Sequence, residues 1–386
     1  MKNLETLILE LCPDGVEFVK LGDVLDYEQP TKYIVKCKDY QNEGMPVLTA
    51  GQTFILGYTD ETNGIFVASK ENPVIIFDDF TTSFHWVDFN FKVKSSAMKM
   101  LRVSSEREVS FRFVYYAMKC IKYQTLEHSR QWISKYSQIE IPLPPIEVQT
   151  EIVRILDKFT SLEAELEAEL DCRKRQYEYY RDKLLSFENV EGQEVEWKKL
   201  NDIVIFKNGK GHEKSIVDEG KYIIVNSKFV STNGMVRKYS DVQLCPLYKD
   251  SILMVMSDLP NGRALAKCFL VDKDDLYTLN QRVGSFVVND NKVVVKFLFY
   301  ILNRNRQLLQ YDNGVDQTNL RKSDILNILI PIPSLAEQHR IVSILDRFES
   351  MTTSLQSGLP AEITARRQQY EHYRDKLLTF KRKGVA

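Results

Sequence analysis

Two stretches of the chain carry apolar residues at intervals of three and four positions, which places their side chains on one face of a long helix. The first series runs from Ile152 to Phe187, and the second runs from Ile341 to Phe380. The same spacing produces the seam of a coiled coil. We therefore expect two long helices that pair through a seam of these residues: Ile155, Phe159, Leu162, Leu166, Tyr177, Tyr180 and Leu184 in the first, and Ile344, Phe348, Leu355, Tyr370, Tyr373 and Leu377 in the second.

The two helical stretches are copies of each other. EVQTEIVRILDKF from Glu147 recurs 189 residues later as AEQHRIVSILDRF, and RKRQYEYYRDKLLSF from Arg173 recurs 193 residues later as RRQQYEHYRDKLLTF. The second copy therefore contains four extra residues, and Gly358 and Pro360 lie at that point. Because proline costs about 3 kcal/mol in a helix interior, we predict a continuous first helix from about 147 to 187 and a break in the second near 358–360.

A segment of short strand-like runs precedes each copy. MPVLTAG, GIFVAS, NPVIIFDDF and HWVDFNFKV lie between residues 30 and 140, and KYIIVNS, SILMVMSD, ALAKCFLV and VGSFVV lie between 195 and 333. Each segment also contains an apolar run with helical spacing, at 111–124 and at 295–311, and each ends in a proline-bounded strand, IPLPP or IPIPS. Alternating short runs with turn residues between them predict two similar α+β domains with mixed, mainly antiparallel sheets.

These patterns define an expected organisation for the whole chain. We predict a first globular domain with a short N-terminal helix at 1–145, a spacer helix at 146–190, a second globular domain at 191–333, and a second spacer helix, broken near 358–360, at 334–386. An antiparallel helix pair would give the molecule pseudo-two-fold symmetry. It would also bring the N-terminal helix near the end of the second copy, so the arrangement would be pseudo-cyclic.

Composition limits the function classes. The chain has 52 Lys and Arg against 53 Asp and Glu, so any nucleic-acid binding must come from local patches. The six cysteines include no C-x-x-C pair, which argues against a structural zinc site and fits a reducing compartment. The N-terminus lacks a signal peptide, and the apolar runs are far shorter than the roughly 20 residues that span a bilayer. We therefore expect a soluble, cytoplasmic protein.

Motifs for catalysis are missing. The chain contains no GxxxxGK[ST] phosphate loop and neither of the tetrapeptides Asn-Pro-Pro-Tyr and Asp-Pro-Pro-Tyr that are expected around a flipped adenine. The five histidines show no metal-ligand spacing. We predict a chain without catalytic residues and without a bound metal.

Clusters of polar, basic and aromatic residues occur in both globular segments. Lys and Arg contact phosphates, while Asn, Gln and Arg can read base edges bidentately. For any single residue ordinary loop composition is the commoner explanation, so the prediction rests on finding such clusters in both segments. The DNA-binding candidates are Thr49, Gln52, Tyr58, Thr81, Thr82, Lys94 and Ser95 in the first domain, and Lys207, Lys210, Asn226, Lys228, Arg237, Asn261, Arg263, Asn280, Gln281, Arg282, Gln317, Asn319 and Arg321 in the second.

The repeated helical motifs resemble a known family. The pattern IPLPP…EVQTEIVRILDKF…RKRQYEYYRDKLLSF and its second copy, with a variable domain before each, resemble the specificity subunit of type I restriction-modification systems over essentially the whole chain. A single RDKLL is a weak signal. Its double occurrence with the intervening domains is specific.

The resemblance implies a non-catalytic DNA-recognition subunit with two target-recognition domains. Each domain would read one half of a bipartite asymmetric site in duplex DNA, and the helices would set the gap between the halves. The family's partners are two methyltransferase (modification) subunits and two restriction/translocase subunits. S-adenosylmethionine, ATP and Mg²⁺ are expected on those partners and no cofactor on this chain. The alternative is a non-catalytic coiled-coil scaffold whose globular domains bind protein partners.

Overall fold

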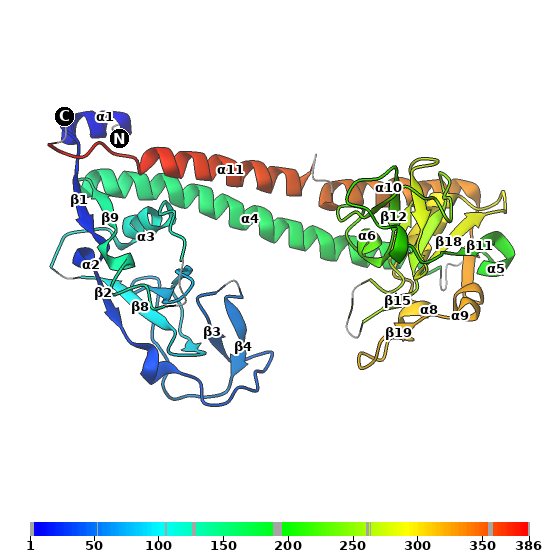
Figure 1. Cartoon of the computed structure of the whole chain (residues 1–386), viewed down its shortest axis with the longest axis horizontal. Helices are drawn as coiled ribbons and strands as arrows, with labels where there is room; N and C mark the ends of the chain where they lie inside the picture. The colour runs from blue at the N-terminus through cyan, green and yellow to red at the C-terminus, as the bar shows by residue number, and fades with distance from the viewer. Residues whose placement is uncertain are drawn as a thin grey trace. The chain divides into compact units, whose positions relative to one another are not determined.

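The computed structural model describes residues 4–51, 53–104, 106–125, 129–187, 195–259, 262, 264–353 and 358–384. The chain forms two compact units (Figure 1). The first combines Met1–Ala168 with Glu362–Ala386, and the second is Glu169–Ala361. Each unit contains one globular domain, which we call the first domain (17–143) and the second domain (196–332). In the described part of the chain, no helix has the length and apolar character needed to cross a membrane.

The first domain consists of a two-stranded, a three-stranded and a four-stranded sheet. The four-stranded sheet has the order β2-β8-β5-β6, the three-stranded sheet has the order β4-β3-β7, and β1 pairs with β9. All pairs are antiparallel except β3–β7, which is parallel. The elements of the first unit up to β9 are α1 (Leu4–Leu11), β1 (Glu17–Lys20), α2 (Leu21–Val24), β2 (Leu25–Glu28), η1 (Pro30–Tyr33), β3 (Met45–Leu48), β4 (Ile55–Thr59), β5 (Val74–Asp78), β6 (Phe84–Val87), β7 (Lys92–Val93), β8 (Met98–Val103), α3 (Phe111–Lys119), η2 (Tyr136–Gln138) and β9 (Glu140–Leu143).

The second domain repeats this topology. Its sheets have the orders β11-β18-β14-β16, β13-β12-β17 and β10-β20, with a parallel pair again at β12–β17, and a short additional pair joins β15 to β19. The elements are β10 (Glu196–Lys199), α5 (Leu200–Ile203), β11 (Val204–Asn208), η3 (Glu213–Ser215), β12 (Tyr222–Val225), α6 (Ser227–Ser231), β13 (Tyr239–Ser240), β14 (Ile252–Val255), β15 (Ser257–Asp258), β16 (Cys268–Leu270), β17 (Tyr277–Leu279), β18 (Val283–Val288), α7 (Val295–Leu302), α8 (Arg306–Leu309), β19 (Thr318–Asn319), α9 (Lys322–Leu326) and β20 (Leu329–Ile332).

Individual backbone hydrogen bonds identify equivalent positions in the two domains. After β5, the N–H of Asp79 donates to Ala97 (2.9 Å), and the N–H of Gln131 donates to the carbonyl of Asp79 (2.8 Å). After β14, the N–H of Met256 donates to Arg282 (3.0 Å), and that of Leu320 donates to Met256 (2.8 Å). Asp79 therefore corresponds to Met256. The predicted α+β class with two similar domains is confirmed.

The helices differ between the two copies as predicted. Helix α4 (Ile146–Leu185) runs without interruption for 40 residues. The second copy consists of α10 (Leu335–Thr353) and α11 (Leu359–Leu377), with Gly358 directly before α11 at φ +79°. A Cβ at Gly358 would lie 2.8 Å from the carbonyl oxygen of Met351, so only glycine fits there. Pro360 is tolerated because it lies in the first turn of α11.

Aromatic stacking marks the predicted seam in each unit. In the first unit, the ring centroids of Phe159 and Tyr373 are 5.5 Å apart, and Arg367 bridges Glu163 and Glu167 at 2.5 and 2.6 Å. Residue numbers thus rise along α4 as they fall along α11, so the helices are antiparallel there. In the second unit, Tyr180 stacks on Phe348 at the equivalent position, with centroids 5.7 Å apart.

Burial of the seam is incomplete. Tyr180 and Tyr373 are 39% and 37% exposed, although they stack on phenylalanines. Leu355 lies outside the described residues. The other seam positions are half-buried: Ile155, Phe159, Leu162, Leu166, Tyr177, Leu184, Ile344, Phe348, Tyr370 and Leu377.

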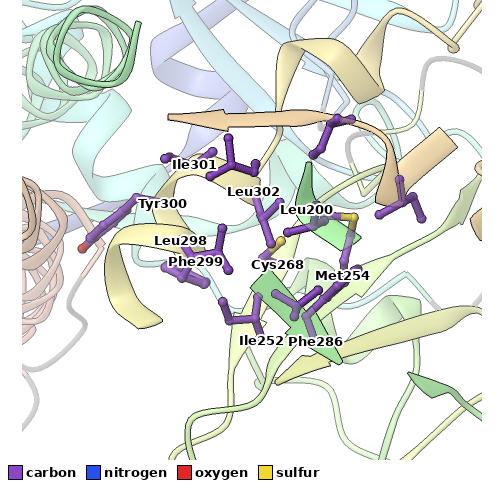
Figure 2. Close-up of a cluster of buried hydrophobic side chains, with 14 of the residues drawn as sticks. Leu200, Ile252, Met254, Cys268, Phe286, Leu298, Phe299, Tyr300, Ile301 and Leu302 are labelled. Atoms are coloured by element: carbon purple, nitrogen blue, oxygen red, sulfur yellow. The ribbon is translucent and has the colours of Figure 1, made fainter. Parts of the chain in front are cut away.

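A second apolar face of the helices, separate from the seam, enters the domain cores. Val148, Ile152 and Leu156 are fully buried in the core of the first domain, and Ile341 and Leu345 are fully buried in the core of the second. Figure 2 shows the second core, where side chains from helix α7 meet those of strands β14, β16 and β18. Each helix copy is therefore part of its domain as well as part of the helix pair.

Three predicted elements differ from the structure. The helix expected at 111–124 ends at Lys119. The helix expected at 295–311 splits into α7 and α8, because Arg304 has φ +60° and the Asn305 side chain caps α8 by accepting from the N–H of Gln307 (2.9 Å). The run at 64–69 is not a strand: Phe66 makes only an isolated bridge to Phe91.

Both ends of the chain belong to the first unit (Figure 1). Val16 donates its N–H to Lys381 (2.9 Å) and accepts from the N–H of Lys383 (3.0 Å), so β1 begins beside the segment that follows α11. Leu4 of α1 and Leu378 are buried in the same core. The expected position of the N-terminal helix, near the end of the second helical copy, is confirmed.

Candidate nucleic-acid interface

In each domain, DNA-binding candidates lie in the loops that follow the two strands of a parallel pair, β3–β7 in the first domain and β12–β17 in the second. These candidates occupy equivalent positions in the two domains. In the first domain the N–H of Lys94, after β7, donates to Leu48 at the end of β3 (3.1 Å). In the second domain the N–H of Asn280, after β17, donates to Val225 at the end of β12 (3.1 Å). Lys94 therefore corresponds to Asn280, and Thr49 corresponds to Asn226. Because parallel strands end at the same edge of a sheet, each pair of loops is brought together.

The β5–β6 turn of the first domain lies next to these loops through the bond from Asp79 to Ala97. Its conformation is set by Asp78, whose Oδ1 accepts from the N–H groups of Phe80 (2.9 Å) and Thr81 (2.8 Å). Thr82 adopts φ +59°, and Thr81 is exposed. The Asp78 side chain therefore stabilises the turn that carries Thr81 and Thr82, and the Asp79–Ala97 bond pairs the end of β5 with the segment that follows Lys94 and Ser95.

His85 holds the loop after β3. Its Nε2 lies 3.0 Å from the carbonyl oxygen of Gly51, and its ring stacks on Phe54 with centroids 4.7 Å apart. Burial lowers the pKa of His85, so the ring is neutral at neutral pH. Thr49 supports the same loop, because its Oγ1 accepts from the N–H of Gly51 (3.3 Å).

Two candidates of the first domain do not join this group. Tyr58 lies at the far end of β4, opposite Pro46, where its carbonyl accepts from Gln41 (2.7 Å). Gln52 is outside the described residues. The described group is therefore Thr49, Thr81, Thr82, Lys94 and Ser95.

In the second domain, buried His212 positions the loop after β11. Its ring nitrogens contact the carbonyl oxygen of Lys210 (2.7 Å) and Thr278 Oγ1 (2.9 Å). The N–H of Lys210 donates to Leu279 (3.1 Å), which places Lys210 beside Asn280. The bonds from Met256 to Arg282 and from Leu320 to Met256 add Arg282 and strand β19. The second group therefore contains Lys210, Asn226, Asn280, Gln281, Arg282, Gln317 and Asn319.

Several of these polar side chains have partners within the domain. Asn226 caps α6 by accepting from the N–H of Phe229 (2.8 Å). Gln281 donates to Glu213 Oε1 (3.0 Å), and Gln317 donates to Ser257 Oγ (2.8 Å). Asn226 is thus a structural residue, whereas Gln281 and Gln317 remain exposed and can exchange their partners for a ligand.

The remaining candidates of the second domain lie apart from the group or at its margin. Lys207 is on β11, opposite Ser285, and Lys228 is in α6. Arg237 Nε donates to the carbonyl of Gly234 (2.9 Å). Arg321 is the N-cap residue of α9, next to Leu320. Asn261 and Arg263 are outside the described residues.

A buried ion pair beneath the first group was missed by the sequence analysis. Lys99 and Asp79 are 0% and 1% exposed, with Nζ and Oδ2 3.3 Å apart. The other oxygen, Asp79 Oδ1, accepts from the N–H groups of Gln131 (3.1 Å) and Trp132 (2.8 Å). The only sequence signal is a lysine between Met98 and Met100 in an apolar strand.

Polar anchors join each domain to its helix, and their first component is a buried glutamine. Gln149 accepts from the N–H of Ser110 (2.9 Å) and donates to the carbonyl of Pro144 (2.7 Å). Gln338 accepts from the N–H of Val294 (2.8 Å) and donates to Lys292 (2.8 Å) and Pro333 (2.9 Å). The two glutamines hold the same place in the repeated motif.

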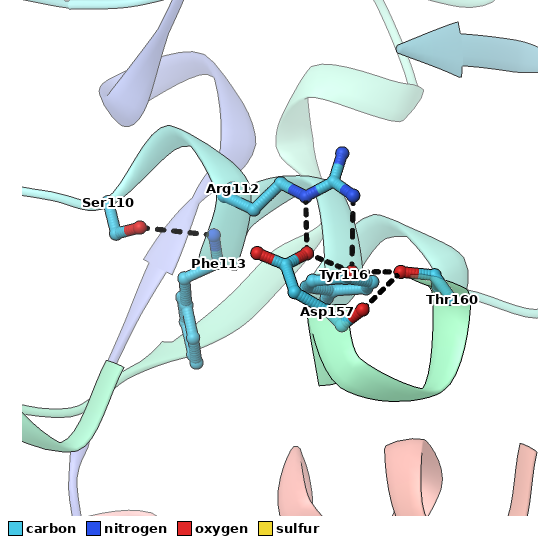
Figure 3. A network of polar contacts seen from close by, with 6 residues as sticks. All are labelled: Ser110, Arg112, Phe113, Tyr116, Asp157 and Thr160. Atoms are coloured by element: carbon cyan, nitrogen blue, oxygen red, sulfur yellow. Dashed lines mark hydrogen bonds and ion pairs between the residues drawn. The ribbon is translucent and has the colours of Figure 1, made fainter. Parts of the chain in front are cut away.

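The second component is a tyrosine–aspartate contact (Figure 3). Tyr116 donates to Asp157 Oδ1 (2.5 Å), which also accepts from Arg112 Nε (2.8 Å). In the second unit, Tyr300 donates to Asp346 Oδ1 (2.5 Å), and Lys296 donates to Asp346 Oδ2 (2.8 Å). The signal for these residues was present in the sequence, because both aspartates stand in the motif ILDKF or ILDRF.

The structure therefore combines two domains of the same topology, a duplicated helical motif and polar loops that differ between the domains. The sequence model of the type I restriction modification DNA specificity domain matches the chain twice, at residues 13–171 and 193–365, and the chain belongs to this family. It is a specificity subunit of the type I restriction-modification class.

Individual relatives cover nearly the whole chain. The chain is 43% identical to the type I restriction enzyme EcoR124I/EcoR124II specificity subunit of Escherichia coli over 405 residues, which cover 97% of this chain and 98% of the relative. A putative type I restriction enzyme specificity subunit of Haemophilus influenzae is 27% identical, with 98% of this chain and 100% of the relative covered. Both relatives are named as specificity subunits.

Solved structures share the fold at low sequence identity. The S subunit of a type I restriction-modification system from M. genitalium superposes with a TM-score of 0.53 at 17% identity, over 94% of this chain and 96% of that chain. A chain from a structure described as the basis of complex assembly and conformational transition of the type I R-M system gives a TM-score of 0.55 at 15% identity, over 97% and 99%. These likenesses support the two-domain α+β architecture.

Proposed function

We propose that the chain binds a bipartite, asymmetric target in duplex DNA, with one domain on each half-site. The observation that carries this proposal is that equivalent loop positions hold different chemistry in the two domains. Lys94, a cation, corresponds to Asn280, a neutral amide. One scaffold with two different polar surfaces is suited to reading two different sequences.

The residues of the two groups can be divided by the parts of DNA that they can contact. Lys94, Lys210 and Arg282 can neutralise phosphates, while Asn280, Gln281, Gln317 and Asn319 can form bidentate contacts with base edges. The net charge of −1 leaves the phosphate contacts to such local groups and to partner subunits. The chain then supplies sequence recognition within a larger assembly.

Partner subunits complete the proposed assembly. Two modification subunits would dock on the helical regions and supply S-adenosylmethionine and adenine methylation, and two restriction subunits would supply ATP- and Mg²⁺-dependent activity. An exposed aromatic residue on α4, Tyr179 (62% exposed), fits such a docking surface. Tyrosine is enriched at protein interfaces because it combines an apolar body with a polar tip.

A domain exchange tests the proposal. Residues 16–140 are replaced by the corresponding segment of a homologue with a different target, and the reconstituted methyltransferase complex is assayed by sequencing of methylated DNA. We expect one half-site to change while the other half-site and the gap stay the same. An unaltered target, or a footprint that protects no split site, would contradict the proposal and favour a protein-binding scaffold.

A further inference from the structure

The contact between each domain and its helix combines apolar burial with directed polar bonds. Val148, Ile152 and Leu156 bury their side chains in the first domain. Such burial drives association, but it is non-directional and tolerates small rotations and shifts. Hydrogen bonds depend steeply on distance and angle. The polar anchors therefore determine how the domain is oriented on its helix.

The anchors lie at two separated points. Gln149 and Asp157 are eight residues apart on α4, which corresponds to about 12 Å along the helix. The first anchor holds the N-terminus of α3 through the N–H of its N-cap, Ser110. The second holds the body of α3 through Arg112 and Tyr116, which lie on its first two turns (Figure 3). Because α3 is bonded to α4 at two separate points, it can neither slide along α4 nor rotate on it without breaking one of these bonds.

The second unit reproduces both anchors with conservative changes. Gln338 holds the N-terminus of α7, and Asp346 accepts from Lys296 and Tyr300. Tyr300 also donates to Glu349 Oε2 (2.8 Å). The loops differ between the domains while these anchors recur, so the anchors serve a requirement that both domains share and that is independent of the sequence read.

The hydroxyl groups of Tyr116 and Tyr300 remain protonated and can therefore always donate a hydrogen bond. Both side chains are buried, and burial followed by the contact with a carboxylate raises the pKa of Tyr116. Burial likewise raises the pKa of Tyr300 beside Glu349 and Asp346. Each hydroxyl therefore keeps its proton at any physiological pH. A neutral donor to an ionised acceptor forms a short, strong hydrogen bond.

We propose that Tyr116–Asp157 and Tyr300–Asp346 are positioning contacts that fix the number of base pairs tolerated between the two half-sites. The proposal rests on the bipartite recognition proposed above. One extra base pair moves a half-site by about 3.4 Å and rotates it by about 35° around the DNA axis. A domain can follow that change only by turning on its helix, which requires breaking the directed bonds.

The test uses the reconstituted methyltransferase complex and a set of duplexes. Each duplex carries both half-sites, and the gap has the native length or is one base pair shorter or longer. Tyr116→Phe and Tyr300→Phe each remove one hydroxyl and keep the ring. We expect the ratio of methylation at the native gap to methylation at the altered gaps to fall by about tenfold, the worth of one hydrogen bond to a charged group. The bases required in each half-site should stay the same.

Two further variants separate positioning from stability. Tyr115→Phe is the matched control, because Tyr115 packs on Phe84 and Trp86 and its hydroxyl has no hydrogen-bond partner among the described residues. It should leave the ratio at the wild-type value. Asp157→Asn keeps an oxygen that accepts from Tyr116 but loses the charge, so it should give an intermediate ratio and serves if Tyr116→Phe does not fold.

The outcomes distinguish this inference from the function on which it rests. If the wild-type complex methylates no split site, bipartite recognition fails. If the wild type is selective for one gap, and Tyr116→Phe, Tyr300→Phe and Asp157→Asn all keep its ratio or lose methylation equally at every gap, the contacts only stabilise the fold and the inference is overturned.

Discussion

The two domains place opposite chemistry at the same point of the same sheet. In the first domain Lys99 and Asp79 form a buried ion pair. The backbone hydrogen bonds of Asp79 identify Met256 as its counterpart, and the strand pairing identifies Gly284 as the counterpart of Lys99. At these two positions the first domain therefore has two charged side chains. The second domain has the thioether side chain of Met256 and, at Gly284, no side chain.

The backbone bonds on either side of Asp79 and Met256 are kept, whereas the side chains between the strands exchange charge for apolar volume. Gly284 is matched to its surroundings, because a Cβ there would lie 2.7 Å from Phe206 Cε2 and 2.9 Å from Met256 Sδ. The side-chain packing beneath the loops therefore differs between the two domains, whereas the anchors to the helices are the same in both.

The largest expected effect comes from breaking the ion pair. Lys99→Met removes the cation and leaves the Asp79 carboxylate buried, which should destabilise the first domain by about 3–5 kcal/mol. Hydrogen exchange measured by mass spectrometry on peptides from β5 and β8 reports this loss separately from the second domain.

A double variant sharpens the test. Asp79→Asn combined with Lys99→Met keeps the Oδ1 acceptor for Gln131 and Trp132 and removes both charges. Since an apolar replacement of a complete buried pair is often neutral, most of the stability should return. Equal instability of the single and double variants would show that the charge is not the cause.

A smaller effect is expected at the glutamine anchors, which recur in both units. Gln149→Leu leaves one buried N–H and one buried carbonyl without their partner and should cost about 2 kcal/mol. Gln338→Leu removes three hydrogen bonds instead of two. It should therefore lower the free energy of unfolding of the second unit by about 1 kcal/mol more than Gln149→Leu lowers that of the first. Hydrogen exchange at α3 and α7 measures both costs. A larger loss for Gln149→Leu would contradict the comparison of the two anchors.

The smallest effect is expected at the paired loop positions. Lys94→Ala should weaken binding of the assembled complex to every DNA sequence by at most about 1 kcal/mol and lower the salt slope by about one. Asn280→Ala should instead lower discrimination at one base pair by about 1 kcal/mol, with the salt slope unchanged. Fluorescence anisotropy with duplexes at several salt concentrations measures both quantities. Identical salt slopes for the two variants would contradict the assigned roles.

Much of the architecture could be predicted from the repeat. The repeated apolar spacing predicted the helices, the change of offset from 189 to 193 residues located the break near Gly358, and the matching runs before each copy predicted the similarity of the two domains. The break was predictable because Gly358 and Pro360 act locally, through backbone conformation. The early end of α3 and the division of α7 from α8 were not predictable, because the apolar spacing continues through Arg304, whose positive φ depends on its surroundings.

The candidate site was predictable only as a set of loops. Thr49 and Lys94 are 45 positions apart in the sequence and meet because β3 and β7 pair in parallel, which no local pattern indicates. The same limit applies to Lys99 and Asp79, which lie on different strands. Tyr58 has a suitable side chain, but the strand direction places it at the opposite end of the sheet.

The bond between Val16 and the segment after α11 has a consequence for the order of events during synthesis. Residues 362–386 complete the first unit, whereas the second unit is continuous from 169 to 361. Domains generally fold as the chain emerges from the ribosome, starting from the N-terminus. Here the half that is translated first must wait for the last residues of the chain, so the half that is translated second is the first that can be finished.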